Sequence, residues 1–365
     1  TATTGYNTVT TGKRFMSYPG GSKDAFGFDD GTRSLPGSIP DARLIGGKFT
    51  PQQLQEYGRA FADNWEPTAT SSMRPQQTYS VVGGNTFGRF GLVGALTFAN
   101  KPVNQSEIQR FVRQEGTRPI VFTNYEDFRS NTESARLGGV LNLAIRLNPA
   151  NKIVFRNTVT RDTDKEAREF QGYDGSNDGT LLSQRLRWVE RGLFSSSVEG
   201  NHAMPSLGNS LFKWQMTVSN STRNEPDMRE VIRGKLPDGR FIFSALSSSG
   251  QRFFNDLNDR ILEPQAEWSK PFFQGAFTGI FSVGFRGTFR ERQFQARRFR
   301  FIPQRATTLD LFLPSNELFA GKNIRPDGFQ ILEYTRATDR YDASMDIYAG
   351  YAMVDMNLGP RWRLV

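Results

Sequence analysis

The strongest constraint on this chain is a period-two alternation of apolar and polar side chains after about residue 76. From Phe277 to Arg290, Phe, Gly and Val fill every second position, and mostly polar residues fill the positions between them. Successive side chains of a β-strand point to opposite faces, so this pattern predicts strands with one apolar and one polar face. The same alternation recurs in residues 137–148, 185–191, 211–220 and 261–269.

The alternation and the turn residues together predict a series of antiparallel strands. We expect them near residues 77–84, 88–99, 133–147, 152–163, 181–203, 209–221, 257–271, 275–290 and 339–357. Within Asp342–Leu358 the alternation changes phase, which predicts a β-bulge. Residues 361–365 resemble the beginning of a further strand. The 31 Phe and 35 Gly also suit an all-β protein.

The predicted connections alternate between short and long. Short ones fall at residues 148–151, 205–208 and around Gln274-Gly275, and long ones at residues 161–180, 223–255 and 293–339. Outer-membrane β-barrels have short periplasmic turns and long outer loops, so the lengths favour that architecture. A soluble, secreted β-sandwich that binds a partner or serves in adhesion remains the alternative. In a sandwich Phe281, Phe285 and Trp214 would pack against a second sheet.

The first 75 residues differ from the rest, being rich in Gly, Thr, Asp and Pro. One helix is expected there, since Thr50 can cap it, Pro51 suits its first position, and Leu54, Tyr57 and Phe61 share a face. It should end near residues 62–63. We therefore divide the chain into two parts, residues 1–75 and residues 76–365.

Composition argues against several function classes. The chain has no Cys, which rules out disulfides and thiolate chemistry. Its net charge of +9 comes from basic residues scattered along the chain, without a nucleic-acid-binding motif, so no nucleic-acid partner is expected. No apolar run is long enough for a transmembrane helix, and Thr1–Thr11 lacks the features of a secretory signal.

No catalytic constellation is evident. The single histidine, His202, would have to serve any triad or multi-histidine metal site, and an ordinary hydrogen-bonded role is the better interpretation. Glu263 and Glu267 share a predicted strand face but lie roughly 13 Å apart along it, too far for a glycosidase pair. We therefore expect no enzyme activity, no catalytic residues, no metal and no cofactor.

Several segments resemble TonB-dependent outer-membrane receptors, especially the large type with a carboxypeptidase-like N-terminal extension. They are Thr11-Gly12-Lys13-Arg14-Phe15, Gly20-Gly21 followed by residues 26–36, and Gly138–Pro149. The resemblance implies a plug domain inside a transmembrane antiparallel barrel of about 22 strands. Residues 1–75 would be the C-terminal part of the plug, and residues 76–365 about the first half of the barrel. The chain is then expected to be a fragment.

The resemblance also implies function, location and partners. An intact receptor of this type binds a scarce nutrient (a siderophore, vitamin, oligosaccharide or peptide) and imports it through plug rearrangement. It lies in the bacterial outer membrane and draws energy from the TonB complex through an N-terminal part missing here. The partners that the resemblance implies are thus the TonB complex, outer-membrane lipid, a small solute and a surface lipoprotein lid.

Candidate site residues follow from the predicted faces. Basic residues on the polar face could line a lumen and meet an anionic solute, but pairing with acids of the plug and of neighbouring strands is the favoured interpretation: Arg146, Arg156, Arg185, Arg187, Lys213, Arg286 and Arg290. Outward Trp188, Trp214 and Trp268 could form an interfacial aromatic girdle. In the first part, Asp29 and Asp30 could ligate calcium, but a turn in which Arg33 pairs with a carboxylate is the favoured interpretation.

Overall fold

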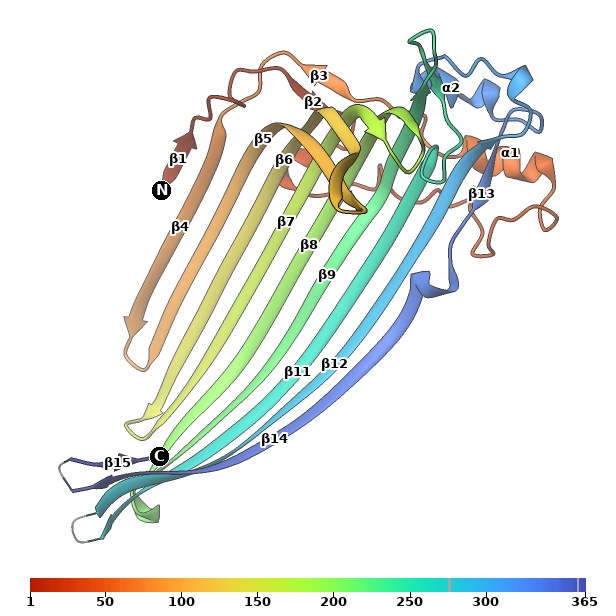
Figure 1. Ribbon diagram of the computed structural model, residues 1–365. Helices are drawn as coiled ribbons and strands as arrows, with labels where there is room; N and C mark the ends of the chain where they lie inside the picture. The colour runs from red at the N-terminus through yellow and green to blue at the C-terminus, as the bar shows by residue number, and fades with distance from the viewer. Residues whose placement is uncertain (275–276, 360) are drawn as a thin grey trace.

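The computed structural model describes residues 1–274, 277–359 and 361–365, and it is dominated by one open antiparallel sheet (Figure 1). The strand order is β1-β4-β5-β6-β7-β8-β9-β11-β12-β14-β15, with β10 beside β9 and β13 beside β12. The all-β prediction is confirmed. Strand bounds are β1 Ala2–Gly5, β4 Gln76–Phe87, β5 Phe90–Glu115, β6 Arg118–Asn148, β7 Asn151–Asp174, β8 Gly179–Met204, β9 Ser210–Lys235, β10 Phe241–Phe243, β11 Gln251–Gln274, β12 Phe277–Pro303, β13 Phe329–Glu333, β14 Arg340–Leu358 and β15 Arg363–Leu364.

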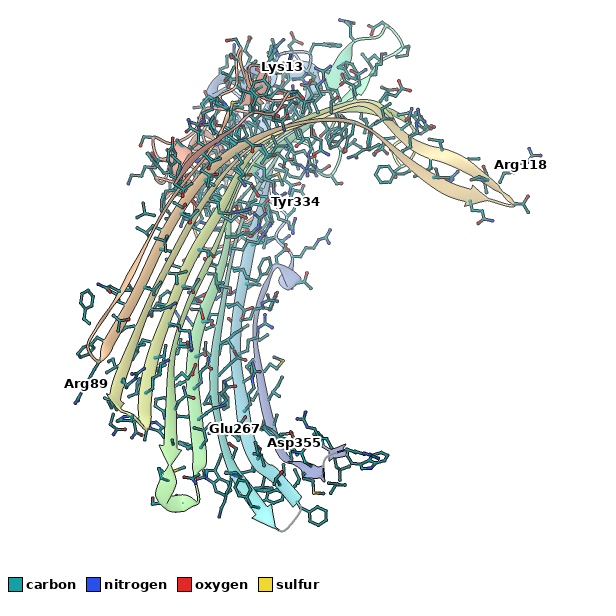
Figure 2. All side chains as sticks on the ribbon, turned by 90° about the vertical axis from the view of Figure 1, so that its left-hand side faces the viewer. Lys13, Arg89, Arg118, Glu267, Tyr334 and Asp355 are labelled. Carbon is teal, nitrogen blue, oxygen red and sulfur yellow. The ribbon has the colours of Figure 1, made fainter. Side chains whose placement is uncertain are left out.

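The strands continue well beyond the alternating stretches that predicted them. Residues 161–174 continue β7, so the long connection predicted at 161–180 is wrong and only residues 175–178 join β7 to β8. The predicted long connections at 223–255 and 293–339 shrink to residues 236–250 and 304–339. Backbone pairing continues through strand segments whose side chains are polar on both faces, and such segments carry no alternation signal. The β5–β6 hairpin, not predicted beyond residue 99, projects from the sheet near Arg118 (Figure 2).

The two ends of the sheet have different connections. Short turns at residues 88–89, 149–150 and 205–209 lie at one end, called the turn end. The predicted turn around Gln274-Gly275 involves residues outside the described part. The opposite, loop end carries connections 236–250 and 304–339. Because β1 runs antiparallel beside β4, residues 6–75 also connect two neighbouring strands at the loop end (Figure 1).

Cross-strand registers assign each strand residue to one of two faces. Towards the turn end, one face carries a continuous apolar band from β4 to β14, which we call the band face. Its members include Val81, Phe90, Leu96, Leu141, Phe155, Val198, Met216, Leu262, Phe281, Phe285, Tyr348 and Val354. Many are strongly exposed, as Leu96 (65%) and Leu141 (54%) illustrate.

No second sheet covers this band in the described part of the chain. The other sheet there pairs only β2 (Phe15–Ser17) with β3 (Thr68–Thr70). Phe281 and Phe285 remain 37% and 47% exposed. The packing that a soluble sandwich requires is therefore missing among these residues.

A hydrophobic core forms instead at the loop end. It joins Leu44, Leu54, Phe61 and Trp65 of the first part to β12 and the 304–339 connection, which contributes Phe319. Trp65 stacks at 4.3 Å, centroid to centroid, on Phe319. Three single-turn elements lie in the part of this connection that precedes β13: η3 (Ala306–Thr308), α2 (Ser315–Leu318) and η4 (Gly321–Asn323). Two segments far apart in sequence thus share one core.

The predicted helix exists as α1 (Pro51–Arg59). Thr50 caps it, and the Thr50 and Gln53 side chains bond each other's backbone N–H in a capping box. The helix ends at Arg59, before the predicted residues 62–63. Three further single-turn helices, η1 (Asp24–Phe26), η2 (Pro205–Leu207) and η5 (Ala337–Asp339), lie in connections. Among the described residues, no helix is both long and apolar enough to cross a membrane.

The bulge predicted in Asp342–Leu358 is wrong. Strand β14 pairs with β12 in one unbroken register from Arg340 to Leu358. Apolar side chains simply occupy both faces here, with Ile347 and Met353 opposite to Tyr348 and Val354. The phase change in the sequence therefore reflects two-sided apolar character and no extra residue.

Candidate functional site

The face opposite the band carries ion pairs between neighbouring strands, and we call it the polar face. The predicted basic residues Arg146, Arg156, Arg185, Arg187, Lys213, Arg286 and Arg290 all lie on it by register. Most are paired: Arg156 with Glu199, Arg185 with Glu230, Arg187 with Glu225, Arg286 with Glu263, and Arg290 with Asp259. Pairing with acids on neighbouring strands was the favoured interpretation of these residues.

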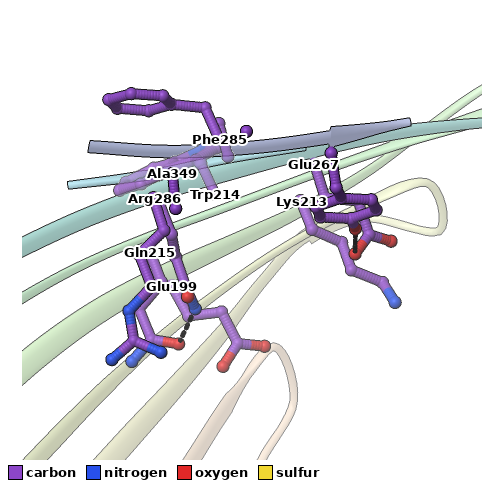
Figure 3. A pocket seen from close by; sticks show the side chains of 12 residues that line it. Glu199, Lys213, Trp214, Gln215, Glu267, Phe285, Arg286 and Ala349 are labelled. Carbon is purple, nitrogen blue, oxygen red and sulfur yellow. Dashed lines mark hydrogen bonds between the residues drawn. The ribbon is translucent and has the colours of Figure 1, made fainter. Parts of the chain in front are cut away.

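A shallow groove of about 400 Å³ opens on the polar face near the turn end (Figure 3). Strands β8, β9, β11, β12 and β14 supply its lining, which includes Glu199, Lys213, Gln215, Glu267, Arg286 and Tyr351. Gln265 Nε2 donates to Gln215 Oε1 at 2.9 Å, and the Tyr351 hydroxyl donates to Glu267 Oε2 at 2.7 Å. Amides, carboxylates, an ammonium group and an aromatic ring thus converge, a set that suits hydrogen bonding to a polar solute.

The carboxylates Glu263 and Glu267 both accept hydrogen bonds from neighbouring side chains. Glu263 accepts from Arg286 and Thr288, and Glu267 accepts from Tyr351. The groove residues therefore form a hydrogen-bonding lining.

His202 has two hydrogen-bond partners, as an ordinary structural histidine would. Its Nε2 accepts from Trp214 Nε1 at 3.0 Å, and its Nδ1 lies 2.7 Å from Asn151 Oδ1. Trp214 and Trp268 lie on the band face towards the turn end. Trp188 does not share this environment: it is 1% exposed beneath residues of the first part, so its assignment to an outward girdle is wrong.

The second candidate site is the turn Tyr18–Arg33, which we call the clasp. Arg33, 2% exposed, donates to Asp24 Oδ1 and Asp29 Oδ1, both at 2.9 Å. Its guanidinium also lies 4.1 Å from the centroid of the Trp188 ring. The predicted pairing of Arg33 with a carboxylate is confirmed, and β8 provides the aromatic floor.

Asp30 belongs to a separate hydrogen-bonding set. It accepts from the Ser22 backbone and hydroxyl and from the Thr32 hydroxyl. The hydrogen bond from Thr32, then those from Ser22, hold the pKa of Asp30 well below its ordinary value. No group of three or more acidic or histidine side chains suited to a metal occurs among the described residues. The geometry is that of the predicted side-chain-stabilised turn.

The clasp holds charges in a buried setting. Burial raises the pKa of Asp24, but hydrogen bonds and charge from Arg33, followed by those from Lys165, outweigh it, and the net pKa lies below the ordinary value. Burial lowers the pKa of Arg33, but its hydrogen bonds to Asp24 outweigh burial, and the net pKa lies above the ordinary value. Burial raises the pKa of Tyr18 well above its ordinary range. The ionised pair is the favoured state at neutral pH.

Acid should open the clasp. Because the folded pKa of Asp24 is depressed, its contribution is present above the unfolded value of about 3.9 and is lost as pH falls through the folded value. Protection factors of the amides of residues 18–33, which correct for the pH dependence of intrinsic exchange, should stay high from neutral pH to about pH 4 and fall below it. Asp24→Asn should remove most of this pH dependence. Loss of protection between pH 7 and about pH 5 would contradict the assignment.

Sequence reasoning found Arg33 and its acidic neighbours but missed the partners on the sheet. Lys165 Nζ lies 2.9 Å from Asp24 Oδ2, and Glu190 accepts from the Asp29 backbone at 2.9 Å. Both come from strands more than 100 residues later, and no local pattern points to them.

Comparison with protein-family models, with curated proteins and with solved structures finds no match for this chain. Its function is therefore argued from geometry and from the residues themselves.

Proposed function

We propose that this chain forms part of the wall of a bacterial outer-membrane β-barrel receptor. The receptor would bind a scarce nutrient and import it with energy from the TonB complex. The observation that carries the proposal is the uncovered apolar band on one face of a long-stranded antiparallel meander, opposite a face carrying ion pairs. In a barrel the band would meet lipid, and the polar face would line the lumen.

The height of the band fits a bilayer. On β6 it runs from Leu137 to Ile145 and on β5 from Phe90 to Phe98, about nine residues each, and on β12 it runs from Phe277 to Phe289, about 13 residues. A tilted strand crosses the hydrocarbon layer in about 9–11 residues. Beyond this height the band face is covered by residues 6–75 or carries polar side chains such as Asn258 and Gln293. An apolar stretch of this limited height is typical of a membrane boundary.

The ends of the sheet support an orientation. The turn end would face the periplasm, and the loop end, with its aromatic core, would face outward. Ordered connections at the outer end would contact the solute first. The groove of Glu199, Gln215, Glu267 and Tyr351 would offer it polar contacts within the lumen. The family resemblance adds a plug to this proposal, and rearrangement of the plug would open the lumen to the solute.

The function is tested in the native host by deleting the gene and measuring uptake. Uptake of one class among siderophores, vitamins, oligosaccharides and peptides should fall to background. It should return with the wild-type gene and be abolished in wild-type cells by a proton-motive-force uncoupler. The protein should fractionate with the outer membrane. Recovery of the folded protein in the detergent-free soluble fraction, or unchanged uptake of all four classes, would overturn the proposal.

A further inference from the structure

We propose that the clasp, residues 18–33, is a membrane-surface anchor on the lipid side of the wall, presenting Phe26 and Phe28 to the edge of the lipid layer. The inference rests on the proposed function, because the apolar band defines where that layer lies. It names outer-leaflet lipid as the partner of a segment that no pattern in the sequence assigned to the membrane.

The clasp lies on the band face, immediately beyond the band. Asn100 of β5 donates to the Ala25 carbonyl at 3.3 Å, and Thr163 of β7 donates to the Gly27 carbonyl at 2.8 Å. Both residues share a face with Leu96 by register. Neighbouring strands β5 to β8 thus hold one short segment.

Gly27 explains how the backbone approaches the sheet so closely. Its φ is +79°, and an added Cβ would lie 3.0 Å from the Ala135 Cβ and 3.1 Å from the Thr163 hydroxyl. Only glycine tolerates both the left-handed backbone and this contact. The residues on either side are consequently held at fixed positions just above the band.

Two aromatic side chains of the clasp remain uncovered. Phe26 is 62% exposed, and its ring centroid lies 6.0 Å from that of Phe98, which ends the band on β5. Phe28 is 37% exposed, with the Arg161 guanidinium 4.4 Å from its ring centroid. The buried Arg33 pairs with Asp24 and Asp29, on either side of these two residues, and so ties down the turn that carries both rings.

Lipid is the occupant that these contacts favour. Phe26 extends the apolar band through its contact with Phe98. Lys23, exposed three residues before Phe26, supplies positive charge complementary to lipid phosphates, whereas Arg161 beside Phe28 is paired with Glu190. Aromatic rings beside cations at the end of an apolar band are the chemistry of a membrane interface.

This placement changes the expectation for the first part of the chain. A plug would contact the polar, lumen-facing side of the wall, whereas the clasp contacts the band face through Asn100 and Thr163. In the proposed receptor the clasp therefore lies outside the barrel wall.

The test uses single spin labels, which are practical because this chain has no Cys. Phe26→Cys and Phe28→Cys are labelled in the intact protein reconstituted in phosphatidylcholine vesicles containing phosphatidylglycerol. Collision rates with oxygen, which enters lipid, and with a water-soluble nickel chelate are compared. Leu96→Cys on the band and Thr97→Cys on the opposite face are the matched pair, and Lys13→Cys is the water-exposed control.

The oxygen-to-nickel ratio should be severalfold higher at positions 26, 28 and 96 than at positions 13 and 97. A high ratio at position 96 with low ratios at 26 and 28 would overturn the anchor and leave the membrane proposal standing. A low ratio at position 96 as well would overturn both. If a label disturbs folding, Phe26→Trp replaces it. Its added fluorescence, relative to Phe26→Leu, should be quenched by brominated lipid if the anchor is correct and unchanged if it is not.

Discussion

Replacing Arg33 with methionine should release the clasp and cost about 3–5 kcal/mol of its local stability. Methionine removes the guanidinium that bridges Asp24 and Asp29 and leaves two carboxylates largely buried, each 12% exposed. It also removes the cation over Trp188. Lys165 can compensate for Asp24 alone. The loss should therefore be large and confined to this segment.

Hydrogen exchange measures that loss directly. Amides of residues 18–33 should exchange about 100-fold to 4,000-fold faster in Arg33→Met, because every 1.4 kcal/mol corresponds to about tenfold. The matched control is Arg240→Met, which breaks a surface pair with Asp238 whose side chains are 64% and 47% exposed. Such pairs contribute about 0–1 kcal/mol. Equal effects of the two substitutions would rule out Arg33 as the anchor of the clasp.

Leu141→Arg should destabilise the membrane-embedded protein by about 2–4 kcal/mol, the cost of arginine near the bilayer midplane of a barrel. Leu141 lies midway along the band on β6 and is 54% exposed, so little protein packing is lost. In water the same substitution on an exposed strand position would change stability little. The penalty is thus a signature of lipid at this face.

Val140→Arg provides the control on the opposite face. Val140 is the preceding residue on the same strand, is 37% exposed, and pairs with the uncharged Ala95 and Thr158. Arginine there would enter the polar lumen and should leave stability within about 0.5 kcal/mol. Denaturant unfolding in phosphatidylcholine vesicles gives both values. A similar cost on both faces would argue against a membrane at the band.

The strand regions were predictable where one face is apolar. Residues 277–290 show the reason: a band face of Phe, Gly and Val beside a face of Thr, Ser and Arg repeats with the strand period. Beyond such stretches the prediction failed. Strand β7 continues through Lys165 to Asp174 with polar residues on both faces, so only its backbone pairing with β6 and β8 defines it.

The candidate sites divide in the same way. Alternation placed Arg156, Arg286 and the other basic residues on the polar face, because every second residue of a strand points to the same face. Their partners could not be predicted, since Glu199 and Glu263 come from strands whose register no local pattern specifies. The assignment of residues 1–75 to a plug stays a prediction of the family resemblance, and the contacts of the clasp argue for another place for part of it.

By itself the sequence determined the all-β class, the polarity of each face, the cap of α1 at Thr50 and the pairing of Arg33 with nearby carboxylates. These follow from side-chain period and from contacts between residues close in the chain. Only the tertiary structure decided that Trp188 is buried beneath Arg33, that Trp65 shares a core with Phe319, and that Phe26 remains uncovered beside the band. Each depends on contacts between segments far apart in sequence, which no local pattern specifies.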